Sequence, residues 1–287
     1  MYYGISVPNG GECGDPRELA ELAHIAEAAG WDGIFLEDYI VYSNTEYHSL
    51  PGYPTYDPWV SLAAMALRTE RLRLGTAVTP LSRRRPWKLA KEAMTLDHLS
   101  NGRVILGVGS GDPEASFTAF GEAATARQRA EQLDEGLAIL AGMWSGEPFS
   151  YHGKHFTVQE VLCLPTPVQS PRIPIWIGGA WPLPGPTRRA TRWDGSCLFR
   201  HTIDGSWQDM TAEDVSALQT QVERARGSLQ GYDIAVGGHQ RGADWEAERA
   251  HIRSVAQAGA TWWVEWVPAA DRETMRAAVA RGPLRVE

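Results

Sequence analysis

The sequence is poor in cysteine. It has three cysteines, Cys13, Cys163 and Cys197, in 287 residues. No CxxC pair and no Cys/His spacing typical of a metal site occurs, so the sequence predicts no bound metal. An odd number of widely separated cysteines is typical of a protein from a reducing compartment rather than of a disulfide framework. We therefore expect a cytoplasmic protein.

Long apolar runs and an excess of positive charge are also missing. No apolar stretch approaches the roughly 20 residues of a membrane-spanning helix, and the first residues lack the basic-then-apolar pattern of a secretory signal. The chain has 27 Lys and Arg against 35 Asp and Glu, a net charge of -8. Nucleic-acid and membrane surfaces are bound by basic patches, so we expect neither as a partner.

What the chain does have is a regular alternation of strand-like and helix-like patterns. The apolar runs predict strands at 2–8, 33–38, 72–78, 103–109, 173–179, 194–199, 232–238 and 261–267. The helical patterns fall at 15–30, 57–69, 85–100, 124–146, 187–193, 212–227, 244–259 and 271–282. Some of these helices open with Asp-Pro, a strong helix-start signal.

Eight strands that are each followed by a helix are the count of a (β/α)8 TIM barrel, here a single domain over residues 1–287. The strand runs are apolar throughout, as expected for parallel strands that are buried on both faces. A doubly wound parallel sheet is the alternative fold.

One connection is too long for a plain loop. Residues 147–174 separate the fourth helix from the fifth strand, and "FSYHGKHFTV" (149–158) has the pattern of a hairpin that turns at His152 and Gly153. We expect this hairpin to be an insertion at the mouth of the barrel.

The fourth strand ends in a glycine turn, "GVGSG", with Gly107, Gly109 and Gly111. A dinucleotide fingerprint needs GxGxxG opening directly into a helix. Here the spacing is GxGxG, and residues 112–122 intervene before the next helix. The turn is therefore interpreted as the carboxyl end of a barrel strand, which is where barrels place their chemistry.

Several titratable residues follow the predicted strands. Glu37 and Asp38 could act as general acids or bases, or could be a solvated strand end in which Asp38 caps a turn. His201 and His239 could donate protons near neutral pH, or be plain loop residues. Ser110 has no histidine at a recognisable spacing, so a hydrolase triad is not favoured.

A phosphate site is predicted after the fifth strand. Gly178 and Gly179 lead toward a helix N-terminus, where free backbone N–H groups and Arg188 or Arg189 could hold a phosphate. The run at 83–85, three arginines before a proline, could steer an anionic cofactor or be a solvated loop. Twelve tryptophans hint at a broad aromatic cavity.

Longer blocks of the chain resemble one family. Residues 74–111 ("LGTAVTPLSRRRPWKLAKEAMTLDHLSNGRVILGVGSG"), 119–158, 164–182 and 188–195 resemble, in order, successive blocks of the bacterial luciferase-like flavin-dependent oxidoreductases. Together with the N-terminal segment they cover roughly residues 1–200. The last third of the chain is less diagnostic.

The resemblance implies a barrel that binds a flavin-type cofactor, either reduced FMN used with oxygen or the deazaflavin coenzyme F-420. It implies a non-prolyl cis peptide between Ala77 and Val78 under the cofactor ring. With the strand ends, it predicts a cofactor-binding set of Ser6, Ala77, Val78, Thr79, Gly109, Ser110, Gly111, Gly178, Gly179, Ala180, Trp181 and Arg188. Glu37, Asp38 and Tyr39 are the candidate catalytic residues.

One departure from the family bears on the cofactor. Deazaflavin-dependent dehydrogenases resembling this chain often have a histidine after the strand-two aspartate, where this chain has Tyr39. This favours a reduced-FMN monooxygenase of a small organic substrate, supplied by a separate flavin reductase. The alternative is an oxidoreductase that moves hydride with coenzyme F-420. A flavin-binding protein without activity and a barrel hydrolase are further alternatives, and similar chains are usually homodimers.

Overall fold

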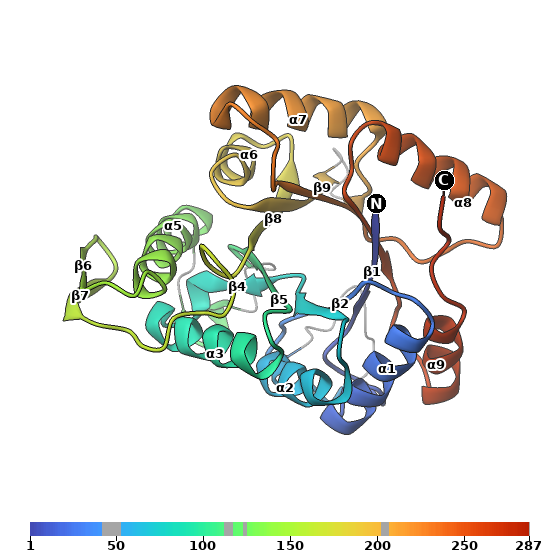
Figure 1. The fold of residues 1–287 in the computed structure, drawn as a ribbon, viewed down its shortest axis with the longest axis horizontal. Coiled ribbons are helices and arrows are strands. Elements are labelled where there is room, and N and C mark those ends of the chain that lie inside the picture. The colour runs from blue at the N-terminus through green and yellow to red at the C-terminus, as the bar shows by residue number, and fades with distance from the viewer. Residues whose placement is uncertain (42–52, 112–116, 123–124, 202–206, 287) are drawn as a thin grey trace.

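Eight parallel strands close into a barrel, and a helix follows each strand on the outside (Figure 1). The structure is a computed structural model, and it describes residues 1–41, 53–111, 117–122, 125–201 and 207–286. Around the barrel the strands are β1 (Tyr2–Val7), β2 (Gly33–Leu36), β3 (Arg73–Thr76), β5 (Val104–Gly109), β8 (Ile175–Trp181), β9 (Gly195–His201), β11 (Asp233–Gly237) and β12 (Trp262–Trp266). β12 pairs in parallel with β1, so the sheet is closed. The predicted TIM barrel is confirmed, and the doubly wound sheet is excluded.

The helices surround the barrel in chain order (Figure 1). They are α1 (Pro16–Ala28), α2 (Pro58–Arg68), α3 (Pro86–Leu99), α5 (Ala126–Met143), α6 (Pro184–Ala190), α7 (Ala212–Arg226), α8 (Trp245–Gln257) and α9 (Arg272–Ala280). The Asp-Pro openings are helix caps, because Asp57 accepts hydrogen bonds from the backbone N–H groups of Trp59 and Val60. The fifth predicted helix, α6, begins three residues earlier than predicted, since Pro184 stands in its first turn.

The third barrel strand is divided. The sequence predicts one strand over 72–78, whereas the structure has β3 and a separate short β4 (Thr79–Pro80), followed by the 3-10 helix η1 (Leu81–Arg83). The break falls at Ala77 and Val78, whose peptide bond is cis, as the resemblance predicts. β4 pairs with β5 and so continues the wall of the barrel beyond the break.

Side chains of each strand divide between two cores. Odd positions of β2 and β5, such as Phe35 and Ile105, form an inner cluster with Trp176, Ala235 and Trp262. Their sequence neighbours, such as Ile34 on β2, belong to the larger core between the strands and the helices. Because successive strand residues point to opposite faces, membership of either core gives the direction of each side chain.

Aromatic rings fill the amino-terminal half of the barrel interior. The ring of Trp176 lies 5.3 Å from that of Phe35 and 5.3 Å from that of Trp262, measured between centroids. Glycines make room for these rings: a Cβ at Gly195 would lie 2.5 Å from Cδ1 of Trp176, and one at Gly4 2.8 Å from Cε2 of Phe35. These rings form a closed aromatic floor below the carboxyl ends of the strands.

The predicted hairpin is present as β6 (Phe149–His152) and β7 (Thr157–Val161). Its turn is held by the carboxylate of Glu135 on α5, which accepts hydrogen bonds from the backbone N–H groups of residues 154–156. Phe156 packs edge-on against Trp87 of α3. The hairpin therefore lies outside α5 and α3 (Figure 1) and not at the mouth, which corrects the expectation from the sequence.

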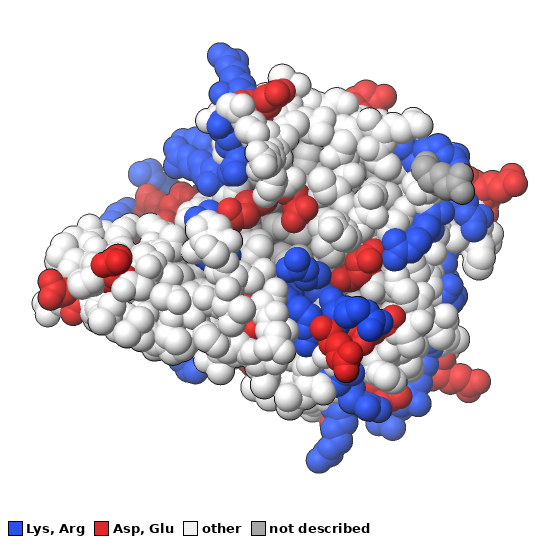
Figure 2. All heavy atoms as spheres, viewed as in Figure 1, with Lys and Arg blue, Asp and Glu red and all other residues white. Residues whose placement is uncertain are grey.

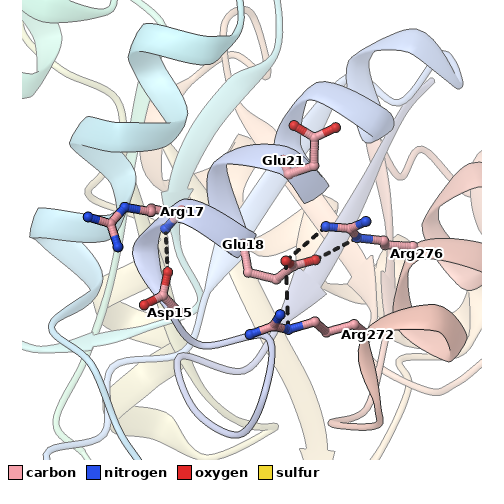
Figure 3. A pocket seen from close by; sticks show the side chains of 6 residues that line it. All are labelled: Asp15, Arg17, Glu18, Glu21, Arg272 and Arg276. Carbon is pink, nitrogen blue, oxygen red and sulfur yellow. Dashed lines mark hydrogen bonds and ion pairs between the residues drawn. The ribbon is translucent and has the colours of Figure 1, made fainter.

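Ion pairs join the first helix to the last. Glu18 of α1 is buried and accepts hydrogen bonds of 2.6 and 2.9 Å from Arg276 of α9, and Nε of Arg272 lies 3.8 Å from it (Figure 3). These residues line a surface pocket with three acidic and three basic side chains. The charges neutralise one another, and the pairs hold the chain ends together around the barrel.

Charged side chains of both signs are interspersed on the face seen in Figure 2. No helix within the described ranges is long and apolar enough to span a bilayer. Across the same residues, no group of three His, Cys, Asp or Glu side chains could hold a metal ion.

A matched pair of glycine substitutions tests the packing of the barrel. A Cβ at Gly75 would lie 2.1 Å from the carbonyl oxygen of Ile105, whereas one at Gly185 meets nothing within 4 Å. Because a backbone carbonyl cannot move aside as a side chain can, we expect Gly75→Ala to lower the free energy of unfolding by about 2–3 kcal/mol. Gly185→Ala should leave it nearly unchanged. Urea unfolding measures both, and equal stabilities of the two variants would contradict this packing.

Candidate active site

The mouth of the barrel is lined by the inward-facing residues at the carboxyl ends of the strands. Alternation from the inner cluster places these side chains. They are Ser6, Glu37, Ala77, Gly109, Gly178, Ala180, Cys197, Phe199, Gly237 and Trp266. Most are small or apolar, and the region that they surround above the aromatic floor is called the opening below.

Val78 and three glycines form a flat apolar surface in this space. A Cβ at Gly107 would lie 3.4 Å from Val78, one at Gly109 2.9 Å and one at Gly178 2.7 Å. Any larger residue at the last two positions would displace Val78 or fill the opening. The surface therefore fits a flat ring system lying against the backbone, as the resemblance predicts for Val78, Gly109 and Gly178.

Two further glycines at the mouth have backbone conformations that L-residues rarely adopt. Gly111 has φ +79° and a Cβ there would lie 2.4 Å from the ring of Phe117. Gly179 has φ +149° and a Cβ there would lie 2.7 Å from Pro186. Both positions therefore require glycine, Gly111 shortly after the end of β5 and Gly179 within β8. Beside Gly111, the carbonyl of Ser110 accepts a 2.9 Å hydrogen bond from the Ser82 hydroxyl.

Of the two arginines proposed to bind a phosphate, Arg189 is paired with a carboxylate and Arg188 is exposed. Arg189 is buried and makes bonds of 2.6 and 2.9 Å to the carboxylate of Asp134 on α5. Arg188 is exposed in the last turn of α6. Of this pair, Arg188 is the residue that could reach a phosphate near Gly178 and Gly179.

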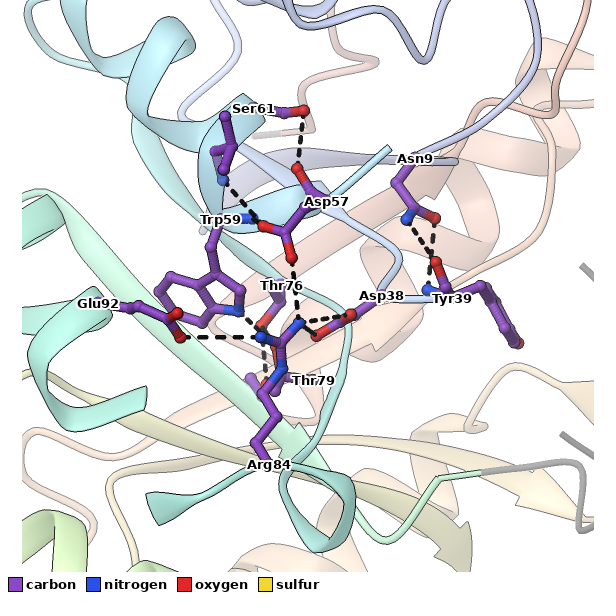
Figure 4. Close-up of polar contacts among 12 residues, drawn as sticks. Asn9, Asp38, Tyr39, Asp57, Trp59, Ser61, Thr76, Thr79, Arg84 and Glu92 are labelled. Atoms are coloured by element: carbon purple, nitrogen blue, oxygen red, sulfur yellow. Dashed lines mark hydrogen bonds and ion pairs between the residues drawn. The ribbon is translucent and has the colours of Figure 1, made fainter. Parts of the chain in front are cut away.

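Asp38 lies on the opposite side of the strand from Glu37. Its carboxylate is buried among the helices and receives bonds of 2.9 and 2.8 Å from Nη2 of Arg84 (Figure 4). Asp57 and Glu92 lie 3.8 and 3.7 Å from the same guanidinium. Burial alone would lower the pKa of Arg84, but the charge of Asp38 raises it above its ordinary value. Asp38 thus has a structural partner outside the barrel interior.

Arg84 and Arg83 are both neutralised, which corrects the expectation that this run steers an anionic cofactor. Nε of Arg83 lies 2.7 Å from the carboxylate of Glu122, and its guanidinium stacks over Phe117. Only Arg85 in the run is exposed.

Thr79 and Trp181 also direct their side chains into the helix layer. The Thr79 hydroxyl lies 3.1 Å from that of Thr76 and accepts a 3.3 Å hydrogen bond from Nε1 of Trp59 (Figure 4). Nε1 of Trp181 donates a 2.9 Å hydrogen bond to Asp214 on α7. Both residues were predicted to lie beside the cofactor. Their side chains point away from the opening.

Glu37 is the inward-facing carboxyl group at the end of β2. Its backbone N–H donates to Val7, so pairing with β1 continues past β2 and holds Glu37 at the rim. Burial and the negative charge of Glu37 together raise the pKa of Tyr53 to about 12, so the two groups lie near each other. Nothing in the sequence pattern distinguishes Tyr53, because it lies between the predicted strand at 33–38 and the predicted helix at 57–69 and does not directly follow a strand.

Asn9 fixes the neighbouring Tyr39. The fully buried amide of Asn9 donates hydrogen bonds of 2.9 Å to the carbonyl of Tyr39 and 2.7 Å to that of Tyr56 (Figure 4). One side chain thus ties the loop after β1 to both ends of the β2–α2 connection. Asn9 was not predicted, since a single asparagine after a strand carries no signal of its own.

The two candidate histidines have different surroundings. His201 is exposed at the end of β9. His239 is held between carboxylates, with Nδ1 bonded to Asp209 and Nε2 2.9 Å from Glu248, and it packs against Trp263. Both ring nitrogens of His239 are therefore engaged with α8 and the segment before α7, in the outer layer.

This opening suits an enzyme whose redox chemistry is carried by a bound planar cofactor, because its described lining is flat, apolar and nearly free of titratable groups. The model of the luciferase-like monooxygenase family matches residues 2–198. The chain belongs to this family.

Curated relatives and solved structures agree with this assignment. The chain is 35% identical over 168 residues to an F420-dependent glucose-6-phosphate dehydrogenase of Microbacterium testaceum, covering 58% of this chain and 48% of the relative. A second such dehydrogenase, from Nakamurella multipartita, is 32% identical with the same coverage. The chain therefore spans about half the length of these relatives.

Two solved structures share the fold over nearly the whole chain. One, an F420-dependent secondary alcohol dehydrogenase, has a TM-score of 0.78 at 16% identity and covers 100% of this chain and 99% of its own. The other, a monooxygenase from Streptomyces bottropensis, has a TM-score of 0.74 at 20% identity and covers 97% of this chain and 96% of its own.

The surroundings of His239 predict a pH dependence of stability. The hydrogen bond to Asp209 outweighs burial and, with Glu248, raises the pKa of His239 from 6.5 to about 9. A raised pKa in the folded state stabilises the fold fully below pH 6.5, and this contribution is lost as pH rises to about 9. We expect the stability difference between wild type and His239→Gln to shrink across that window. An NMR titration of the His239 ring with a midpoint near 6.5 would contradict the assignment.

Proposed function

We propose that this protein is an oxidoreductase that transfers hydride between coenzyme F-420 and a small organic substrate. The observation that carries the proposal is the 35% identity over 168 residues to an F420-dependent glucose-6-phosphate dehydrogenase. Tyr39, in place of a histidine, is the observation that favours the alternative, a reduced-FMN monooxygenase served by a separate reductase.

Val78 and the glycines would hold the cofactor ring. The ring would lie on the flat surface formed by Val78, Gly109 and Gly178, where no Cβ intervenes. The backbone around Gly179 and the guanidinium of Arg188 would hold the phosphate end. The aromatic floor below leaves no room for a deeper ligand, so the ring would stay at the mouth.

Glu37 would hold the proton of the reaction. When bound, oxidised coenzyme F-420 would supply the acceptor for a hydride from the C–H bond of an alcohol. The inward-facing carboxylate of Glu37 would accept the proton of the alcohol O–H. Burial raises the pKa of the Cys197 thiol to about 12, so Cys197 stays neutral and serves as apolar lining.

Cofactor choice is tested by fluorescence titration of the purified protein with F-420 and with FMN, each in the oxidised and the reduced form. We expect binding of F-420 at least about tenfold tighter than that of FMN, equivalent to about 1.4 kcal/mol. Tighter binding of reduced FMN, with substrate-dependent oxygen uptake, would overturn the proposal in favour of the monooxygenase.

Substitutions of two neighbouring carboxylates distinguish a role in proton transfer from a structural role. Glu37→Gln should lower kcat about 100-fold, because the proton acceptor is lost, with F-420 affinity and stability nearly unchanged. Asp38→Asn should lower the free energy of unfolding by about 2 kcal/mol, because it removes the charge that compensates Arg84. Steady-state kinetics and urea unfolding measure both. Full activity of Glu37→Gln would remove Glu37 from the mechanism.

A further inference from the structure

The described rim of the opening carries an exposed aromatic stack. Trp207 lies on β10 (Trp207–Gln208), which pairs antiparallel with the end of β9. Its ring lies 3.5 Å from that of Phe199, at an angle of 16° between planes. Trp207 is 53% exposed, so one face of a large apolar ring is presented to solvent beside the opening.

This stack faces the interior of the barrel. Trp207 is opposite His201, and residues opposite each other in a sheet share a face. Phe199 and Cys197 follow on that same face at intervals of two, and Cys197 packs against the inner cluster. Phe199 is also beside Ala180 in the β8–β9 register. The aromatic stack thus extends the wall that begins at Gly178 and Ala180.

No Lys or Arg side chain accompanies it at the inward-facing positions of the described strand ends, where His201 is the basic residue opposite Trp207. The segments outside the described ranges contain no Lys or Arg in their sequence. Three arginines near the strand ends are paired with carboxylates: Arg84 with Asp38, Arg200 with Asp214 and Arg241 with Glu265. Recognition of a phosphate monoester normally uses Arg or Lys, alone or with backbone N–H groups.

We infer that the substrate of this opening is an uncharged organic molecule with a planar or apolar face that stacks on Trp207 and Phe199, and not a sugar phosphate. The inference rests on the proposed function in that the same opening serves cofactor and substrate. Arg188, on the helix that follows Gly179, would be used for the phosphate end of the cofactor. The substrate would then meet an aromatic wall on one side and the carboxylate of Glu37 on the other.

Calorimetric titration tests this with acetophenone as the apolar probe and glucose 6-phosphate as the anionic one. The protein is first titrated with F-420 and with FMN, and failure of F-420 to bind overturns the proposed function alone. Each probe is then titrated into protein loaded with the cofactor that bound, or into the free protein if neither did. We expect acetophenone to bind and glucose 6-phosphate to give no binding heat.

Variants assign the binding to the aromatic stack. Trp207→Ala should raise the Kd of acetophenone about fivefold, and Trp207→Phe should restore most of the affinity, since aromatic contact is worth that much. Trp87→Ala is the matched control, because Trp87 is a partly exposed tryptophan on α3 outside the barrel, and it should leave the Kd within about twofold. Binding of glucose 6-phosphate, no binding of acetophenone, or an unchanged Kd in Trp207→Ala would each overturn the inference.

Discussion

The packing of Phe35, Trp176 and Trp262 inside the barrel is the constraint on which the opening depends. These rings fill the amino-terminal half of the interior and are accommodated by glycines at facing strand positions. Above them most of the inward positions are glycine, alanine, serine or cysteine, with Glu37, Phe199 and Trp266 as the larger residues. The same alternation that fills the floor therefore places the candidate site at the mouth of the barrel.

Outside the strands, ion pairs and capping carboxylates hold the loops that surround this site. Asp38 and Arg84 connect the end of β2 to the segment before α3. Buried Glu265 at the end of β12 binds Arg241 and Arg281. Glu27 caps the turn before β3: burial would raise its pKa, but N–H bonds from Arg71, Leu72 and Glu70 hold it below 4.5. Charged groups near the strand ends, such as Asp38 and Glu265, thus stabilise the fold through ion pairs.

The fold was predictable from the sequence because its elements repeat a simple pattern. Eight apolar runs and eight helical patterns place every barrel strand, and family resemblance places the cis peptide between Ala77 and Val78. The sequence pattern could not predict the direction in which an individual side chain points. Asp38 follows Glu37 directly, yet Asp38 faces the helices and Glu37 faces the barrel interior. That distinction follows from the register set by Phe35, which is visible only once the inner and outer cores are separated.

The central claim is that Val78, Gly109 and Gly178 form the surface on which a planar cofactor ring lies. A crystal structure of the complex with coenzyme F-420, or with FMN, tests it most directly. The account predicts electron density for the ring against Val78, with its phosphate end toward Gly179 and Arg188. Density for the cofactor at any other place, with the opening above the aromatic floor left to solvent, would contradict it.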